Sequence, residues 1–182
     1  MPNWCENVLL VEGDRQAIDV WNQRLRSNKG SPLGLLSVFV PAKYKQPDES
    51  DWYEAHCSSW GTKWDVPFDT VHEEIIESNC NRYLFETAWS PPLPWLESMA
   101  KDWPELNFVL FFEEPNMQFM GVAHLKDGEL NVIDRNYPDL PENFDWEDEE
   151  LVNAWYEDIA RRRDELMDVI PLAYERAMYD EG

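Results

Sequence analysis

The chain has 182 residues, which is enough for one domain with an appendage and for a sizeable buried core. Its 37 acidic residues outnumber its 15 lysines and arginines, and the net charge of −22 argues against direct binding to nucleic acid or to anionic membranes. The 14% aromatic content argues against a disordered chain. A membrane-spanning helix needs about 20 consecutive apolar residues, and no stretch of the sequence has them. We therefore expect a soluble, cytoplasmic protein.

The first part of the chain predicts a strand followed by an amphipathic helix. Ile18, Trp21 and Leu25 recur at helical spacing. Asp14 can cap the helix that contains them. The predicted elements are a strand at Cys5–Val11, a helix at Asp14–Asn28, a short strand or buried linker at Leu33–Val40 and a short helix at Asp51–Ser59. If Gly61–Val66 is also a strand, Thr62 and Trp64 lie on one face and Lys63 and Asp65 on the other.

The middle of the chain predicts a second helix between strands. The most hydrophobic strand is expected at the centre of the sheet, and Lys126-Asp127-Gly128 is a turn signal between the two strands of a hairpin. The predicted elements are strands at Arg82–Trp89 and Leu106–Glu113, a helix at Pro94–Trp103 and a hairpin of Gln118–Leu125 and Glu129–Asp134. The order strand, helix, strand, strand, helix, strand is the split βαβ arrangement, an α+β fold with an antiparallel sheet and both helices on one face.

The composition changes after Asn136, so we divide the chain into a domain at 1–137 and an acidic helical extension at 138–182. From Asp139 onward there are fifteen acidic residues and four arginines, so half of the net charge lies in the last quarter of the chain. The predicted elements are a linker at Pro138–Asn143 and two successive helices, or one interrupted helix, at Phe144–Arg163 and Glu165–Tyr179.

Two short segments hold three of the ten tryptophans, together with residues that favour unusual backbone geometry. They are Trp60–Asp65 (WGTKWD) and Thr87–Pro92 (TAWSPP), and we expect them to fix each other's position. Aromatic rings are more often structural than ligand-binding, so a core between sheet and loops is one interpretation. The other is an aromatic-lined pocket with polar ends. The pocket residues would be Trp4, Trp60, Lys63, Trp64, Asp65 and Trp89.

These segments also carry a family resemblance. The stretches that share its pattern are Met1–Asn7 (MPNWCEN), Trp60–Asp65, Phe85–Pro92 (FETAWSPP) and Phe119–Gly121 (FMG). The chain resembles the Api92-like (YubB) family of bacteriophages and conjugative plasmids, to which a ferredoxin-like domain is assigned. The resemblance covers about residues 1–134 and implies a ferredoxin-like fold and an origin in a mobile element of a bacterial cell. The family has no established enzymatic activity, so the resemblance supplies neither an activity nor catalytic residues for this chain.

Sequence motifs of catalysis and metal binding are missing from the chain. Its three cysteines and three histidines show no C-x-x-C or H-E-x-x-H spacing, so we expect no metal site and no cofactor. No G-x-S-x-G, P-loop or G-x-G-x-x-G is present. We therefore favour a protein without enzymatic activity. The alternative is a small-molecule binder or an enzyme of unknown activity that uses the aromatic pocket.

The acidic extension is the other candidate for function. Carboxylates at the start of a helix favour its dipole, but the run continues past the first turn. Spaced carboxylates could imitate a phosphate backbone, with Arg161–Arg163 partly neutralising the run or docking the helix. We therefore expect the protein to inhibit a basic, nucleic-acid-handling host or anti-phage defence protein. The partner-binding residues would be Glu147, Asp148, Glu149, Glu150, Glu157, Asp158, Asp164, Glu165 and Asp168.

Overall fold

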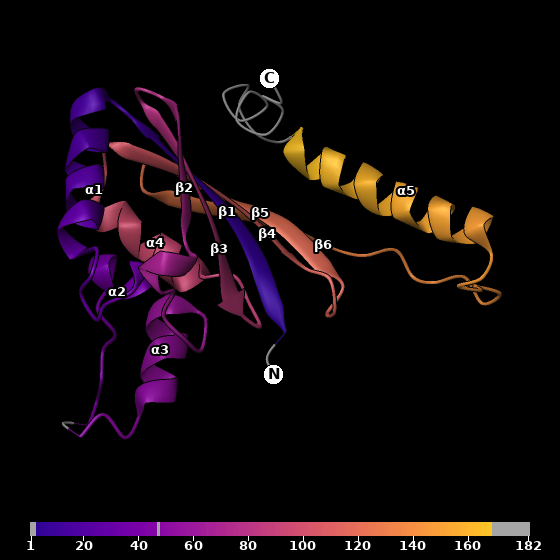
Figure 1. Ribbon diagram of the computed structural model, residues 1–182, viewed down its shortest axis with the longest axis horizontal. Coiled ribbons are helices and arrows are strands. Elements are labelled where there is room, and N and C mark those ends of the chain that lie inside the picture. The colour runs from indigo at the N-terminus through magenta and orange to yellow at the C-terminus, as the bar shows by residue number, and fades with distance from the viewer. Residues whose placement is uncertain (1–2, 47, 169–182) are drawn as a thin grey trace.

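The computed structural model describes residues 3–46 and 48–168. These residues contain a six-stranded sheet with the strand order β2-β3-β1-β4-β5-β6, in which all neighbouring strands are antiparallel. The sheet crosses the middle of the molecule in Figure 1, with α1 to α4 on one side and the long helix α5 on the other. Across the described ranges, no helix combines the length and the apolar character needed to cross a membrane.

The order of the elements reproduces the split βαβ arrangement. The strands are β1 (Trp4–Gly13), β2 (His72–Glu77), β3 (Cys80–Ala88), β4 (Leu106–Glu114), β5 (Phe119–Lys126) and β6 (Glu129–Asn136). The helices are α1 (Arg15–Asn28), α2 (Leu35–Phe39), α3 (Trp52–Trp60), α4 (Leu93–Asp102) and α5 (Glu149–Met167), with a 3-10 turn, η1, at Phe68–Thr70. The first four strands lie in the order β2-β3-β1-β4, and the predicted β5–β6 hairpin extends the sheet beyond β4.

The local sequence accounts for α1 as predicted. The Asp14 carboxylate accepts a hydrogen bond from the Ala17 N–H at 2.9 Å, which caps the first turn. The residues at helical spacing, Ile18, Trp21 and Leu25, are all buried. Their burial ties α1 to the sheet, because each buried apolar side chain of this size contributes about 1.5–3 kcal/mol.

The larger core lies between the sheet and α1, α2 and α4. Alternate residues of β1 enter it, as the two-residue period of a strand requires. The Trp21 ring stacks on Phe39 with 3.9 Å between centroids, and its indole N–H donates to the Tyr83 hydroxyl at 3.0 Å. Helices of the domain therefore cover this face of the sheet.

A smaller core occupies the opposite face, where α5 packs. Phe111 of β4 and Val122 of β5 contribute to this core from the sheet. Ile159 and Leu166 contribute from α5, where they lie seven residues apart along one side of the helix. The predicted acidic extension therefore covers the face that the other helices leave open.

Two predictions in the middle of the chain are wrong. Leu33–Val40 contains the helix α2 instead of the predicted short strand or buried linker, because the Asp65 carboxylate accepts hydrogen bonds from the Gly34 and Leu36 N–H groups, each at 2.9 Å. Gly61–Val66 forms no strand, because Gly61 ends α3 in the left-handed conformation and the following residues bend.

The second strand of the motif is β2, which the sequence analysis does not predict. Its sequence, HEEIIE, has three glutamates in six residues and lacks a clear apolar alternation. The strand pairs with β3 and lies at the edge of the sheet, where charged residues are common.

The C-terminal helix begins later than predicted. Phe144 lies in a loop, and α5 starts at Glu149 because the Asp148 carboxylate accepts from the N–H groups of Glu150 and Leu151 at 3.0 and 3.2 Å. The second predicted helix, Glu165–Tyr179, overlaps the end of α5, and the part beyond Asp168 lies outside the described residues.

Candidate functional site

The densest negative charge lies in residues 139–150, which we call the acidic segment. It holds seven acidic residues and no basic residue, and all of its residues except Phe144 are exposed. The segment joins β6 to α5, on the side of the sheet opposite α1 to α4 (Figure 1). Of the predicted partner-binding residues, Glu147, Glu149 and Glu150 lie exposed here, while Asp148 caps the helix.

The charges along α5 itself are partly neutralised. Arg161 bonds to both Asp158 and Glu165, and this hydrogen bonding lowers the pKa of the Asp158 carboxyl. The other predicted residues of the helix, Glu157 and Asp164, lie seven residues apart and therefore on one side, about 10 Å from each other. Asp168 follows the last turn and is exposed.

The acidic segment is held against α5 by aromatic rings. The Trp155 indole N–H donates to the Pro138 carbonyl at 2.9 Å. The Trp155 ring lies 6.2 Å from that of Phe144 and 6.0 Å from that of Trp146, and the Tyr137 ring is 6.1 Å away. These contacts position the carboxylates of the segment beside the first turns of the helix.

A charged contact docks α5 on the sheet. Arg163 donates to the Glu113 carboxylate through Nε and Nη2, with the closest distance at 2.8 Å. The Tyr137 hydroxyl donates to the same carboxylate, and burial together with this bond raises the pKa of Tyr137. The predicted alternatives for the arginine run therefore both occur, because Arg161 neutralises acids on the helix while Arg163 docks it.

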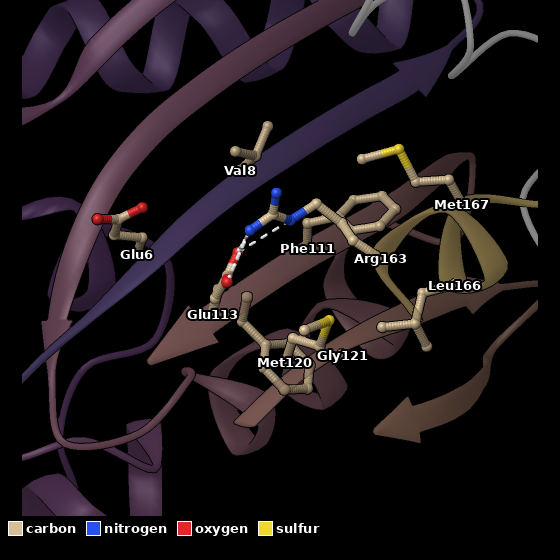
Figure 2. A pocket seen from close by; sticks show the side chains of 10 residues that line it. Glu6, Val8, Phe111, Glu113, Met120, Gly121, Arg163, Leu166 and Met167 are labelled. Atoms are coloured by element: carbon tan, nitrogen blue, oxygen red, sulfur yellow. Dashed lines mark hydrogen bonds and ion pairs between the residues drawn. The ribbon is translucent and has the colours of Figure 1, made fainter. Parts of the chain in front are cut away.

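A cavity of about 370 Å³ lies beside this contact, between α5 and the sheet (Figure 2). Glu113 and Arg163 meet at one side of it, and Glu6 stands at another. The apolar part of the lining comes from β1, β4, β5 and the last turn of α5. These apolar residues are Val8, Phe111, Phe112, Met120, Leu166 and Met167.

The two tryptophan segments hold each other, as expected. The Thr62 hydroxyl donates to the Ala88 carbonyl at 2.9 Å, and the Ser90 hydroxyl donates to the Gly61 carbonyl at 2.6 Å. Gly61 has φ +83°, and a side chain there would overlap the Pro94 ring. The Trp89 backbone is also left-handed, with φ +73°. The unusual backbone geometry of these segments therefore serves their mutual packing.

Two of the predicted pocket residues have structural roles. Trp60 is buried, donates its indole N–H to the Val40 carbonyl at 2.6 Å and stacks on His56 with 4.3 Å between ring centroids. Asp65 fixes the start of α2 and lines a cavity of about 290 Å³ between the loop that precedes α2 and the turn η1. Both residues are thus accounted for without a ligand.

The other predicted pocket residues lie at the surface. Trp4, Trp64 and Trp89 are 42%, 38% and 44% exposed. The Trp4 and Trp64 rings are 6.1 Å apart, and the Lys63 ammonium lies 4.5 Å from the Trp64 ring centroid and 5.9 Å from that of Trp52. These residues form an exposed aromatic surface, and the Lys63 ammonium lies over the Trp64 ring.

Metal ligands and reactive thiols are the two kinds of group that the described residues allow us to assess. Within 3–46 and 48–168, no three His, Cys, Asp or Glu side chains converge so that they could hold a metal ion. Burial raises the pKa of the Cys5 and Cys80 thiols to about 12, so both stay protonated at neutral pH and are poor nucleophiles.

Sequence reasoning offered docking of α5 as one role of the arginine run, but it missed Glu6 and Glu113 and the cavity beside them. Glu6, Glu113 and Arg163 come from three distant parts of the chain, and only the register of β1 with β4 brings the first two together. An acidic residue inside the pattern of a central strand is the one signal that the sequence offers for Glu113, because charged residues are rarely buried without a partner.

Comparisons with known proteins concern the fold. A family model described as "ferredoxin-like domain in Api92-like protein" matches residues 59–157, from the end of α3 into α5. A crystal structure of a protein api92 from Yersinia pseudotuberculosis covers 78% of this chain and 100% of that chain, with a TM-score of 0.52 and 10% identity. No functionally curated protein matches the sequence. The predicted ferredoxin-like α+β fold is thus confirmed.

Proposed function

The chain belongs to the Api92-like protein family, and from this premise we propose that it is a non-enzymatic interaction protein of a bacteriophage or plasmid. It binds a basic protein through the acidic segment and the outer side of α5. The partner is a nucleic-acid-handling host or anti-phage defence protein in the bacterial cytoplasm. The carboxylates occupy its basic channel in place of phosphates and so inhibit it.

The acidic segment is the observation that carries this proposal. Seven carboxylates in twelve residues, without a basic residue among them, give a local charge density that α5 does not reach, since three arginines offset its six acids. Charge of one sign on an exposed surface attracts a surface of the opposite sign over about 10 Å at ordinary salt. The aromatic contacts of Trp155 support the proposal further, because a held segment loses less entropy on binding.

Capture from a bacterial lysate at low and at high salt tests the proposal. The test variant reverses four exposed carboxylates and leaves the capping Asp148 and the paired Asp158 unchanged. Its substitutions are Glu147→Lys, Glu149→Lys, Glu150→Lys and Glu157→Lys. We expect the native chain to retain a basic nucleic-acid-binding protein that added duplex DNA or high salt releases, and the variant to retain none.

A second variant with the same net charge is the matched control. It reverses four exposed carboxylates outside the acidic segment and α5, at Glu97, Asp102, Glu105 and Glu129. We expect it to retain the partner, because the position of the charge decides binding in this proposal. Equal loss in both variants would show that only net charge matters, and capture that DNA does not displace would contradict phosphate imitation.

A second candidate function is ligand binding at the exposed aromatic surface. Trp4, Trp64 and Lys63 favour it, because ligand sites commonly combine aromatic side chains with a few polar or charged groups. Trp64→Ala should then abolish binding of a co-purified molecule and leave the fold intact. The four reversals in the acidic segment and α5 should leave that binding unchanged.

A further inference from the structure

Three glutamates stand side by side next to the cavity between α5 and the sheet. Glu6 of β1 lies directly opposite Glu86 of β3 on one side and opposite Glu113 of β4 on the other. Residues opposite each other in an antiparallel pair point to the same face, with Cβ atoms about 4.5–5.5 Å apart. The sheet therefore presents a row of three carboxylates on the face that α5 covers only in part.

Among the described residues, one cation forms an ion pair with this row, and it does so at the Glu113 end. The Arg163 guanidinium bonds to Glu113 through two nitrogens, and Tyr137 adds a hydroxyl donor to the same carboxylate. Within residues 3–46 and 48–168, neither Glu6 nor Glu86 has an ion pair or a side-chain hydrogen bond. Like charges directly opposite each other destabilise a sheet, so the row leaves negative charge that a further cation would neutralise.

The cavity next to Glu6 has the volume and the apolar lining for the aliphatic part of such a cation. Its volume of about 370 Å³ falls within the range of small-ligand pockets. Val8 and Met120 line it from the sheet, and Leu166 lines it from α5 (Figure 2). An anion would meet the carboxylates of Glu6 and Glu113 there, and the Arg163 guanidinium that lines the described part of the cavity is already bonded to Glu113.

We propose that this cavity accepts a lysine or arginine side chain of the basic partner, an inference that rests on the proposed function. The aliphatic stem packs on Val8, Met120 and Leu166, and the charged head reaches the Glu6 carboxylate. Long cationic side chains pack in this way, with the stem on apolar surface and the head on a polar group. The acidic segment attracts the partner from a distance, and the cavity holds one of its side chains.

A titration with side-chain analogues tests the cavity without the partner. The probes are n-propylguanidinium and n-butylammonium, with butyrate and n-butanol as anionic and neutral comparisons. Methyl resonances of Val8, Met120 and Leu166 in the full chain report on binding. We expect saturable shifts with both cations and no saturation with butyrate or butanol. The affinity for the cations should be at least tenfold lower in Glu6→Gln. Glu97→Gln, on the opposite face, should bind the cations like the native chain.

The outcomes separate this inference from the proposed function. Saturation by butyrate, equal binding by butanol, or cation binding that Glu6→Gln leaves unchanged overturns the inference, whatever the lysate capture gives. If the cations bind as expected but no basic protein is captured, the proposed function is contradicted. The assignment of the bound cation to a side chain of a partner is then contradicted as well. If the free energy of unfolding of Glu6→Gln is no lower than that of the native chain, misfolding is excluded as the cause of lost binding.

Discussion

The tryptophan segments and α5 both lie outside the sheet, but they are held in different ways. Hydrogen bonds to backbone carbonyls and the close approach of Gly61 to Pro94 fix the tryptophan segments. The helix α5 is held by a few apolar side chains and the contact of Arg163 with Glu113, and much of its surface is charged. A region with few buried contacts opens more easily, so α5 should separate from the sheet at a lower cost than the tryptophan segments do.

The largest loss of stability should come from Gly61→Ala, in the tryptophan segments. The left-handed backbone and the overlap with Pro94 together should lower the free energy of unfolding by roughly 2–5 kcal/mol. Urea denaturation measures the loss. Gly128→Ala is the matched control, since Gly128 has φ +82° but open space around it, and it should lose about 1–2 kcal/mol. Equal losses would mean that the packing against Pro94 contributes nothing.

Alkaline pH should destabilise the main core through Tyr83. Burial raises the pKa of Tyr83 to about 12, above the value of about 10 in an unfolded chain. The unfolded state therefore releases this proton first, so Tyr83 by itself should lower the stability by about 2–3 kcal/mol as the pH rises from 10 to 12. Urea unfolding at several pH values measures this slope. The buried Cys5 and Cys80 thiols lower the stability in the same pH range, so Tyr83→Phe should make the slope shallower without removing it. The exposed Tyr156→Phe should leave the slope unchanged, and a slope shared by all three chains would contradict the assignment.

Arg163→Met should loosen α5 and leave the rest of the domain unchanged. Loss of the ion pair leaves Glu113 with Tyr137 alone, and because the pair is partly exposed we expect a cost of about 1–2 kcal/mol. Amide hydrogen exchange should quicken in α5 and stay the same in α1. Arg161→Met removes only exposed pairs and should change neither region. Faster exchange throughout the domain would show that α5 is an integral part of the core.

Glu6→Gln should have the smallest effect on stability, and with the opposite sign. Removing one of three neighbouring carboxylates relieves like-charge repulsion, so the free energy of unfolding should rise by about 0.2–1 kcal/mol. Thermal unfolding at low salt measures the gain, and high salt should reduce it. Glu97→Gln, on the other face, should show no gain. A loss of stability in Glu6→Gln would mean that Glu6 makes a stabilising contact in the folded chain.

Local signals in the sequence predict the domain better than the site. The cap at Asp14 and the buried stripe of Trp21 and Leu25 belong to one stretch of chain, so they could be read directly. The Leu33–Val40 run is mostly apolar and fits either a helix or a strand. Its helical form depends on Asp65, about thirty residues away, which no local pattern reveals.

The cavity depends on pairings that the sequence does not encode locally. Glu6 and Glu86 are eighty residues apart, and only the register of β1 with β3 places them opposite each other. Arg163 meets Glu113 fifty residues away, through the packing of α5. The acidic run itself was readable, because charge is a property of composition, but the distinction between paired and unpaired acids required the fold.

The glutamates of β2 have one more consequence. This strand leaves one row of its backbone N–H and C=O groups without a neighbouring strand, and Ile75 on it is 65% exposed. An open edge of this kind invites a strand from another molecule, which is how sheets begin to aggregate. Glu73 pairs with Lys29 and Glu74 with Arg82, so charged groups of both signs occupy this strand, and Glu77 would meet its own copy if two such edges came together. Charged residues on an edge strand are a common means by which proteins avoid pairing with other copies, and here the same residues hide β2 from pattern recognition.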